Sequence, residues 1–145
     1  MRLKFQKLTE NNKASINHFI MTLSFNELKQ LATDPKNKLI RILWLCLKYV
    51  DNHPESKKEI GVFWLDDRNI MINSKIFASF LHRKSNTVNR NLRSHQFAYR
   101  KIKIEMRLLI NEELPDPEHW LLRYCDKFNR STTEEEVIPN HYLNL

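Results

Sequence analysis

The first half of the chain is dominated by apolar residues at helical spacing. Ser24 and Glu27 form a capping-box pattern, which predicts a short helix that ends before Pro35. Residues 36–52 predict a longer helix that is apolar on nearly every side. A helix of that kind belongs at the centre of a small fold, because all of its faces must be covered.

A change of period follows this central helix. Residues 55–60 can form one more helical turn, and Gly61, the only glycine in the chain, is a natural C-terminal cap. Residues 62–72 then place short apolar runs on both sides of a polar cluster, which predicts extended segments joined by a turn. Asp66 and Asp67 lie in that cluster, and no third acidic ligand is near in sequence. We therefore expect a turn here, and no metal site.

The next segment contains a short helical pattern and a tight polar break. Ser74 can cap this helix, since its side-chain oxygen can accept from a free backbone N–H. The apolar stripe that follows consists of Ile76, Phe77, Phe80 and Leu81. Residues 83–86 interrupt the stripe, and Ser85 or Asn86 can cap a new helix.

The second helix of this pair, residues 86–97, has two different sides. Val88 and Leu92 lie four residues apart on its apolar side. The opposite side, at i, i+3, i+4 and i+7, carries Asn86, Asn89, Arg90 and Arg93. Two short helices, the second with a polar and cationic outer face, predict a DNA-reading helix-turn-helix.

Residues 99–124 predict two strands after the second helix. Apolar residues alternate with charged ones at Ile102, Ile104, Met106 and Leu108. Residues 120–124 predict a second strand, and the polar stretch 111–118 predicts a loop between them. Two such strands would form a wing, and we expect a mainly α fold with a small β-wing, a winged helix-turn-helix. A helix over residues 99–113 is the competing interpretation.

The charge is concentrated in one part of the chain. The net charge is +7 and the sequence pI is about 9.5, which favours an acidic partner. Between residues 83 and 103 there is no acid, and the seven cations are Arg83, Lys84, Arg90, Arg93, Arg100, Lys101 and Lys103. The basic charge therefore coincides with the predicted helix-turn-helix, although a basic face can also serve solubility alone.

Several classes of function find no support in the sequence. A single glycine leaves no phosphate-cradling loop, and neither G-x-S-x-G nor H-E-x-x-H occurs. Cys46 and Cys125 are too far apart for a zinc pattern. The longest apolar stretch, residues 39–50, contains two cations and is too short to span a bilayer. We expect no enzyme, no cofactor, no metal and no membrane contact.

The chain divides into three expected parts. Residues 1–23 predict an N-terminal arm with a first helical turn, residues 24–130 the winged-helix domain, and residues 131–145 an acidic tail or the start of a linker. We expect the domain to act as a monomer. Two rival functions stay open: a protein-interaction module with a basic face, and RNA binding, for which Tyr99 is the one obvious stacking residue.

Specific residues carry a resemblance to a known family. They are Glu59-Ile60-Gly61 with Trp64, Ala78, the run Asn86-Thr87-x-Asn89-x-Asn91-Leu92-Arg93, and Phe97. At these positions, over roughly residues 37–129, the chain resembles the trichomonad initiator-binding domain, the family of the 39 kDa initiator binding protein. The resemblance implies a winged helix, binding to initiator elements of core promoters in transcription initiation, and a nuclear location. Double-stranded DNA is then the main partner, with the transcription machinery as a further one.

The chain also departs from the family pattern. His82 stands where the family can carry glycine between the two helices, and there it needs a left-handed backbone or a different turn. Arg90 replaces an apolar residue and adds a group able to contact a phosphate or a base. Larger relatives carry a further C-terminal domain, so the chain is either a short member or a fragment.

The helix-turn-helix pattern assigns a role to each candidate DNA-binding residue. Arg93 and Arg90 can each donate two hydrogen bonds to guanine, and Asn86 or Asn89 can pair with adenine. We expect Arg93 and Asn89 on bases and Arg90 on either a base or a phosphate. Phosphate contacts are expected from Lys84, Thr87, Lys101 and Lys103. Asn91 and His95, on the flank of the apolar side, are expected to be structural.

Overall fold

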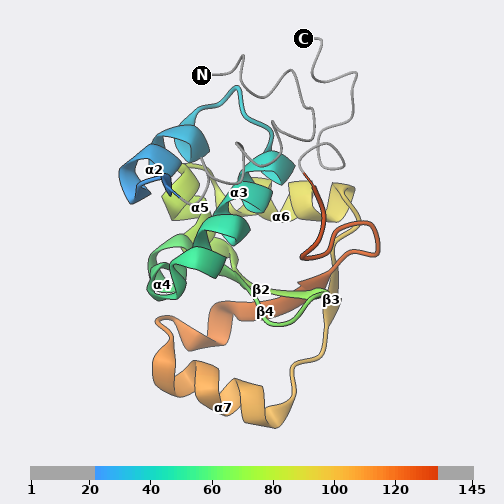
Figure 1. The fold of residues 1–145 in the computed structure, drawn as a ribbon. Coiled ribbons are helices and arrows are strands. Elements are labelled where there is room, and N and C mark those ends of the chain that lie inside the picture. The colour runs from blue at the N-terminus through green and yellow to red at the C-terminus, as the bar shows by residue number, and fades with distance from the viewer. Residues whose placement is uncertain (1–21, 134–145) are drawn as a thin grey trace.

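The computed structural model describes residues 22–133 (Figure 1). Its helices are α2 (Phe25–Thr33), α3 (Leu39–Asn52), α4 (Lys57–Ile60), α5 (Ser74–Leu81), α6 (Ser85–Ser94) and α7 (Ile104–Glu113), with 3₁₀ turns η2 (Pro54–Ser56) and η3 (Pro117–His119). Its strands are β1 (Val62–Trp64), β2 (Asn69–Asn73), β3 (Ala98–Arg100) and β4 (Trp120–Tyr124). Nearly all of the predicted arm and most of the predicted tail lie outside the described residues.

The four strands form one antiparallel sheet in the order β1-β2-β4-β3. Helices α2 to α6 lie on one side of this sheet and α7 lies on the other (Figure 1). Ile70 and Ile72 of β2 point into the larger core, whereas Met71 between them points into the smaller one. The alternation of side chains along a strand thus lets one sheet bury both of its faces. This mainly helical fold with a small antiparallel sheet is the predicted class.

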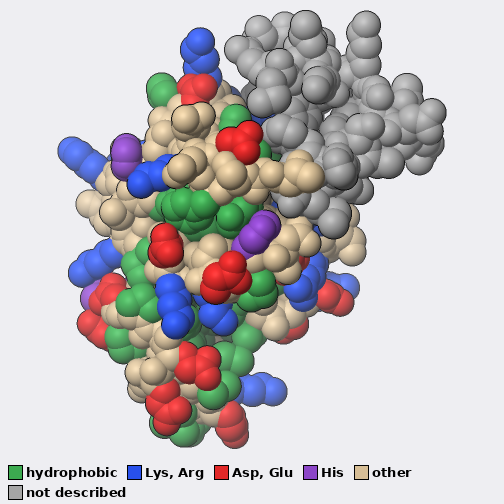
Figure 2. All heavy atoms as spheres, turned by 60° about the vertical axis from the view of Figure 1, so that its left-hand side comes forward, with side chains coloured by type: hydrophobic (Ala, Val, Ile, Leu, Met, Phe, Trp, Pro, Cys, Tyr) green, Lys and Arg blue, Asp and Glu red, His purple; other side chains and the backbone are tan. Residues whose placement is uncertain are grey.

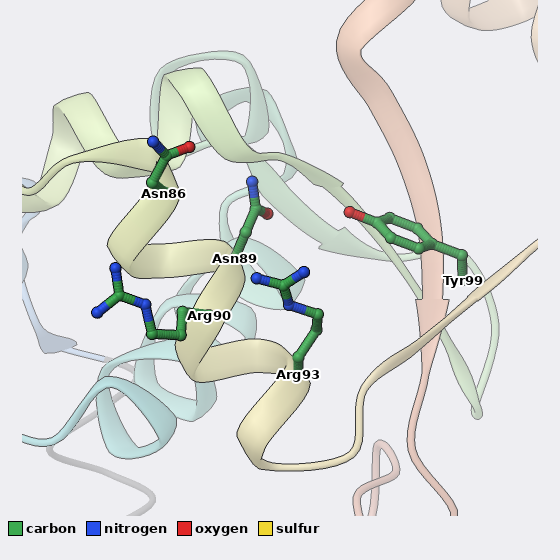
Figure 3. A pocket seen from close by; sticks show the side chains of 5 residues that line it. All are labelled: Asn86, Asn89, Arg90, Arg93 and Tyr99. Carbon is green, nitrogen blue, oxygen red and sulfur yellow. The ribbon is translucent and has the colours of Figure 1, made fainter.

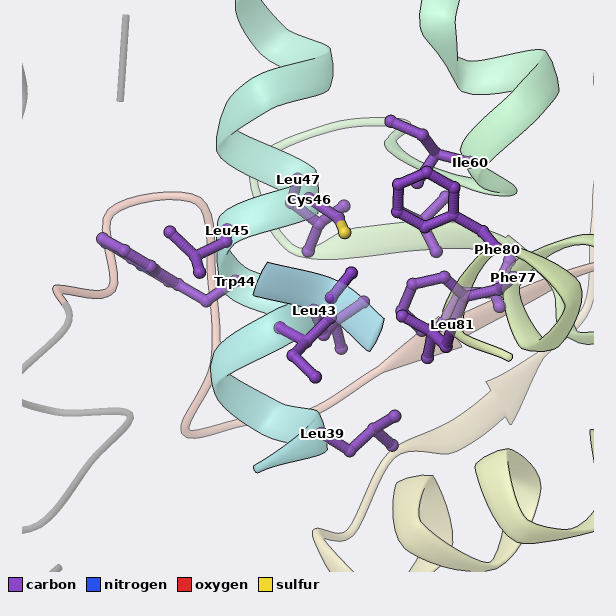
Figure 4. Close-up of a cluster of buried hydrophobic side chains, with 14 of the residues drawn as sticks. Leu39, Leu43, Trp44, Leu45, Cys46, Leu47, Ile60, Phe77, Phe80 and Leu81 are labelled. Atoms are coloured by element: carbon purple, nitrogen blue, oxygen red, sulfur yellow. The ribbon is translucent and has the colours of Figure 1, made fainter. Parts of the chain in front are cut away.

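Helix α3 is the centre of the larger core, as its composition predicts. Nine of its side chains are buried, among them Ile42, Leu43 and Cys46 with no exposed surface. In Figure 4, Leu43 and Cys46 lie toward Phe77, Phe80 and Leu81 of α5 and toward Ile60, whereas Trp44 and Leu45 point to the other side of α3. Burying a side chain of this size stabilises the fold by about 1.5–3 kcal/mol. The helix pair of the predicted helix-turn-helix is therefore held in place by α3.

The turns of the first half form largely as predicted. The capping box of α2 is present, with Ser24 and Glu27 each bonding the other's backbone N–H at 3.0–3.1 Å. Gly61 ends α4 with a left-handed φ of 91°. Asp66 makes the predicted turn, because its Oδ1 accepts from the backbone N–H groups of Arg68 and Asn69 at 2.9 and 2.8 Å.

The predicted caps of the helix pair are wrong. Asn73, not Ser74, caps α5, because its Oδ1 accepts from the backbone N–H groups of Lys75 and Ile76, both at 3.1 Å. Asn73 is fully buried at the end of β2, so its side chain is already fixed where the helix begins. Neither Ser85 nor Asn86 caps α6. That helix starts one residue earlier, after Lys84, which makes no side-chain cap bond.

Helix α7 contradicts the strand predicted over residues 99–110. Only Ala98–Arg100 are extended, as β3, and residues 104–113 are helical. Met106 and Ile110, which are four residues apart, pack with Leu114 against the face of the sheet formed by Met71, Trp120 and Leu122. The apolar residues that completed the strand-like alternation, Ile104 and Leu108, are 76% and 57% exposed.

The need to cover the second face of the sheet thus decided the structure of this segment. The competing interpretation, a helix over residues 99–113, is correct for residues 104–113. The predicted loop is also shorter than expected, since Asn111 to Glu113 belong to α7. Strands β3 and β4 do pair, with Tyr99 opposite Arg123, and α7 is inserted between them. Within residues 22–133, no helix is long and apolar enough to cross a membrane.

His82 adopts a left-handed backbone with a φ of 56° and a ψ of 44° between α5 and α6. The backbone N–H of Arg83 then donates to the carbonyl of Ala78 at 2.9 Å, which closes the end of α5. A residue with a Cβ atom is strained in this conformation. The turn therefore has the geometry that glycine would give it, at some cost in stability.

We expect His82→Gly to raise the free energy of unfolding by about 0.5–1 kcal/mol, because it removes this strain. Urea denaturation monitored by circular dichroism measures the change. His95→Gly is the matched control, since His95 lies at the end of α6 with a φ of −92° and gains nothing from glycine. A loss of stability in His82→Gly would contradict the interpretation.

Candidate nucleic-acid interface

Helix α6 has a buried side and an open side, as predicted. Val88 and Leu92 are 0% and 1% exposed and belong to the larger core. Asn86, Arg90 and Arg93 are exposed on the opposite side, whereas Asn89 is half-buried. The apolar pair anchors the helix, so that its polar side faces outward.

The outer side of α6 borders a hollow that β3 closes on the other side. The residues that line this hollow are Asn86, Asn89, Arg90, Arg93 and Tyr99. Figure 3 shows the hydroxyl of Tyr99 pointing from β3 toward the helix. The structure thus brings together four of the predicted DNA-binding residues and adds Tyr99, which had been considered only for RNA stacking.

Beneath this hollow lies Arg123 of β4, which is 2% exposed. Its guanidinium donates to Oδ1 of Asn89 and to the carbonyl oxygen of Phe97, each at 3.1 Å. It also donates to the hydroxyl of Tyr99, and its central carbon lies 3.9 Å from the centroid of the Tyr99 ring. One side chain of the sheet therefore holds a residue of α6, the loop after α6 and a residue of β3.

The positive charge of Arg123 is buried among neutral partners. Burial lowers the pKa of its guanidinium; Tyr99 acts in the opposite direction, and the like charge of nearby Arg93 lowers the pKa further. An arginine nevertheless stays protonated in a protein. Two guanidinium groups therefore place positive charge at the same hollow, an arrangement that suits a polyanionic ligand.

Among the described residues, the cations around this hollow have no acidic partners. Among residues 22–133, the carboxylates that form ion pairs do so with His119 and Arg130. None of Lys84, Arg90, Arg93, Lys101 and Lys103 pairs with a carboxylate in this part of the chain. By contrast, acidic and basic side chains are interspersed on the side that carries α2 and α4 (Figure 2).

Two cations of the predicted basic segment have structural contacts instead. Arg83 donates to the carbonyl of Asn37 at 3.1 Å, which fixes the turn before α6 to the start of α3. Arg100 stacks on the ring of Tyr124, at 3.9 Å from its centroid. Neither residue was among the predicted DNA contacts.

The remaining predicted site residues lie around the hollow rather than in it. Lys84 is exposed just before α6, and Thr87 is half-buried. Lys101 follows β3 and shares a second hollow with Tyr99. Lys103 lies farther along, just before α7, and lines a different hollow with Lys101 and Ile104.

Asn91 is structural, as expected, because its amide donates to the carbonyl of Thr87 at 3.0 Å. His95 does not lie on the flank of the core, since its side chain is exposed at the end of α6. Sequence reasoning missed Arg123 and underrated Tyr99. The signal available was an arginine inside the otherwise apolar and aromatic strand 120–124, since a buried cation must find acceptors.

One cluster of metal-ligand types occurs among residues 22–133, at Asp116, Glu118 and His119. The two oxygens of Asp116 are already engaged, one with Nδ1 of His119 at 2.7 Å and the other with the amide of Asn73 at 3.2 Å. The hydrogen bond from His119 is the main cause that lowers the pKa of Asp116. These contacts make the cluster a structural brace before β4.

Comparison with known proteins agrees with this geometry. Residues 32–127 match the family described as the transcription-initiator DNA-binding domain (IBD), so the chain belongs to that family. The structure is similar to that of the T. vaginalis IBP39 initiator-binding domain, which was solved bound to the alpha-SCS Inr element. The TM-score is 0.57 at 21% identity, over 83% of this chain and 99% of that one. No curated protein matches the chain.

The contacts of Arg123 lead to a prediction about stability. Arg123→Met should lower the free energy of unfolding by about 1–3 kcal/mol, because the Phe97 carbonyl and the Asn89 amide oxygen lose their donor. Arg100→Met is the control, since Arg100 of the neighbouring strand is exposed and makes a stacking contact with Tyr124 on the surface, with no buried acceptor among the described residues. Equal and small effects of the two substitutions in urea denaturation would show that Arg123 does not brace the fold.

Proposed function

We propose that the chain binds double-stranded DNA at initiator elements of core promoters, with α6 in the major groove. It then acts in transcription initiation, in the nucleus, next to the transcription machinery. The observation that carries this proposal is the outer side of α6. It is exposed, rich in amides and guanidinium groups, and without a carboxylate partner among the described residues. Membership of the initiator DNA-binding family supports the same ligand.

Within this proposal the residues of α6 divide by exposure and chemistry. Arg93 lines the hollow and can donate two parallel hydrogen bonds to O6 and N7 of guanine. The amide of Asn86 is exposed at the start of the helix and can read a base too. Asn89 also faces the bases, and Arg90 can reach either a base or a phosphate.

The phosphate contacts come from residues at the edge of the hollow. Lys84 and Thr87 lie at the start of α6, where the backbone N–H groups of the first turn also attract an anion. Lys101 and Lys103 follow β3 and extend the positive surface along the connection to α7. Such contacts set the register of the protein on the duplex without reading sequence.

A fluorescence-anisotropy titration tests the proposal directly. The probes are a duplex carrying the alpha-SCS Inr element, a scrambled duplex and a matched RNA, each at two salt concentrations. Tight binding to the initiator duplex alone, which persists at the higher salt, supports a sequence-reading domain. Equal binding to all three that disappears at the higher salt leaves only a basic surface, and a protein-interaction module then becomes the better account.

Arg93→Ala should weaken binding to the initiator duplex by about 1–3 kcal/mol and relax the preference at one base pair. The reason is that a guanine would lose its bidentate partner while the rest of α6 stays in place. The measurement is the dissociation constant for the initiator duplex and for a panel of single base-pair variants. An equal loss of affinity on every sequence, the scrambled one included, would assign Arg93 to the phosphates.

Lys101→Ala should weaken binding to all DNA and reduce the slope of log K against log salt by about one unit, because one fewer counterion is released. Titrations at four or more salt concentrations give this slope. Lys29→Ala is the charge-matched control, since Lys29 is an exposed lysine of α2. If both variants keep the slope of the original protein, Lys101 lies outside the interface.

A further inference from the structure

The amide of Asn89 is held in one orientation, and this fixes what it can offer to DNA. Its Oδ1 lies 3.1 Å from a guanidinium nitrogen of Arg123. A guanidinium has only donors, so the oxygen of the amide must face Arg123, and the nitrogen cannot take that place. We propose that Arg123 makes Asn89 a hydrogen-bond donor toward the major groove, so that Asn89 selects a base edge with acceptors only, guanine first.

The group that holds Asn89 is itself fixed from several sides. Arg123 is 2% exposed and donates to the Phe97 carbonyl at 3.1 Å, besides its contact with the Tyr99 hydroxyl. Its guanidinium also stacks on the Tyr99 ring. These partners come from the fold and not from a ligand, so the orientation of the Asn89 amide is set before DNA arrives. Such preorganisation lowers the entropy cost of binding.

The two asparagines of the α6 face therefore differ in chemistry. Within the described residues, the exposed amide of Asn86 has no hydrogen-bond partner and can turn either way. It can accept from N6 and donate to N7 of adenine, the pairing expected of an asparagine. Asn89 is different, because its oxygen faces Arg123 and its Nδ2–H groups are what the amide has left to offer to the hollow that Asn89 lines. The adenine pairing that the sequence suggested for Asn89 is thus disfavoured.

The bases differ in whether their major-groove edges accept hydrogen bonds from a donor such as the Asn89 amide. Guanine presents two adjacent acceptors in the major groove, N7 and O6, and thymine presents O4. Adenine offers N7 but places the N6 amino group, a donor, where Asn89 also has a donor. This inference rests on the proposed function, because the same side of α6 must reach the bases. It adds Asn89 as a specificity-determining residue and Arg123 as the residue that positions it.

The test compares three purines that differ in the group at position 6, which faces the major groove. In the alpha-SCS Inr duplex, guanine, adenine or 2-aminopurine is placed at each position in turn, and anisotropy titrations are made with the original chain and with Asn89→Ala. 2-Aminopurine keeps N7 but has no amino group in the major groove. The position coupled to Asn89 is the one whose preference disappears in Asn89→Ala.

At that position we expect guanine to bind best, 2-aminopurine next and adenine worst, with about threefold to tenfold between the extremes. The reverse order, in which adenine binds best and 2-aminopurine weakens binding, would mean that the Asn89 oxygen reads N6, and it would overturn the inference. Initiator-specific binding without any position coupled to Asn89 would also overturn it. A chain that does not distinguish the initiator from the scrambled duplex would overturn the proposed function itself.

Two further variants separate positioning from folding. Arg123→Gln replaces the donor-only guanidinium with an amide that can present either its oxygen or its nitrogen to Asn89. The ratio of the dissociation constants for adenine and guanine at the position coupled to Asn89 should therefore fall to near one. Asn89→Asp keeps an acceptor for Arg123 and so preserves the fold, but it offers DNA no donor and should abolish the same preference. Asn86→Ala is the matched comparison, and it should leave the preference at the Asn89 position in place.

Cooperative unfolding in urea shows whether Arg123→Gln is folded. If the folded variant keeps the guanine preference, Arg123 does not position Asn89. If Arg123→Gln does not fold, Asn89→Asp decides: a retained preference for guanine contradicts the donor role.

Discussion

The buried guanidinium of Arg123 connects the sheet to the helix that faces DNA. Few side chains could do this, because the link must reach a carbonyl oxygen, an amide oxygen and a hydroxyl at once, and the planar guanidinium has five donors. A buried positive charge is costly unless its donors are satisfied. Here neutral acceptors from three segments satisfy them, and α6 is thereby fixed against β3 and β4 as well as against the helical core.

The contact between Arg123 and α6 depends on the burial of both faces of the sheet. Helices α3 and α5 cover one face and hold α6 through Val88 and Leu92. Ile110 of α7 and Leu114, the residue after that helix, cover the other face. Because β4 lies between β2 and β3, Arg123 of β4 can contact both Asn89 of α6 and Tyr99 of β3. The site is therefore a product of the sheet order.

The electrostatic character of the molecule follows from the same arrangement. Lys84, Arg90 and Arg93 lie at α6, and Lys101 and Lys103 follow β3. None of these five cations has a carboxylate partner among residues 22–133. The carboxylates of Glu112 and Glu113 lie instead on α7, on the far side of the sheet (Figure 1). Such an asymmetric charge distribution can orient a protein as it approaches a polyanion.

The sequence by itself determined the local features of this protein. Four features are properties of neighbouring residues: the helical spacing in α3, the capping box of Ser24, the cap at Gly61 and the two-sided pattern of α6. The run from Asn86 to Arg93 was enough to indicate the family. Only the tertiary structure decided the rest. Residues 104–113 became a helix because the sheet had a second face to cover, Asn73 became a cap because β2 ends there, and the role of Arg123 arises from a contact with Asn89, 34 residues earlier in the chain. The periodicity of a sequence indicates which residues are apolar. It does not indicate which distant surface these residues cover, nor which distant acceptor binds a buried cation.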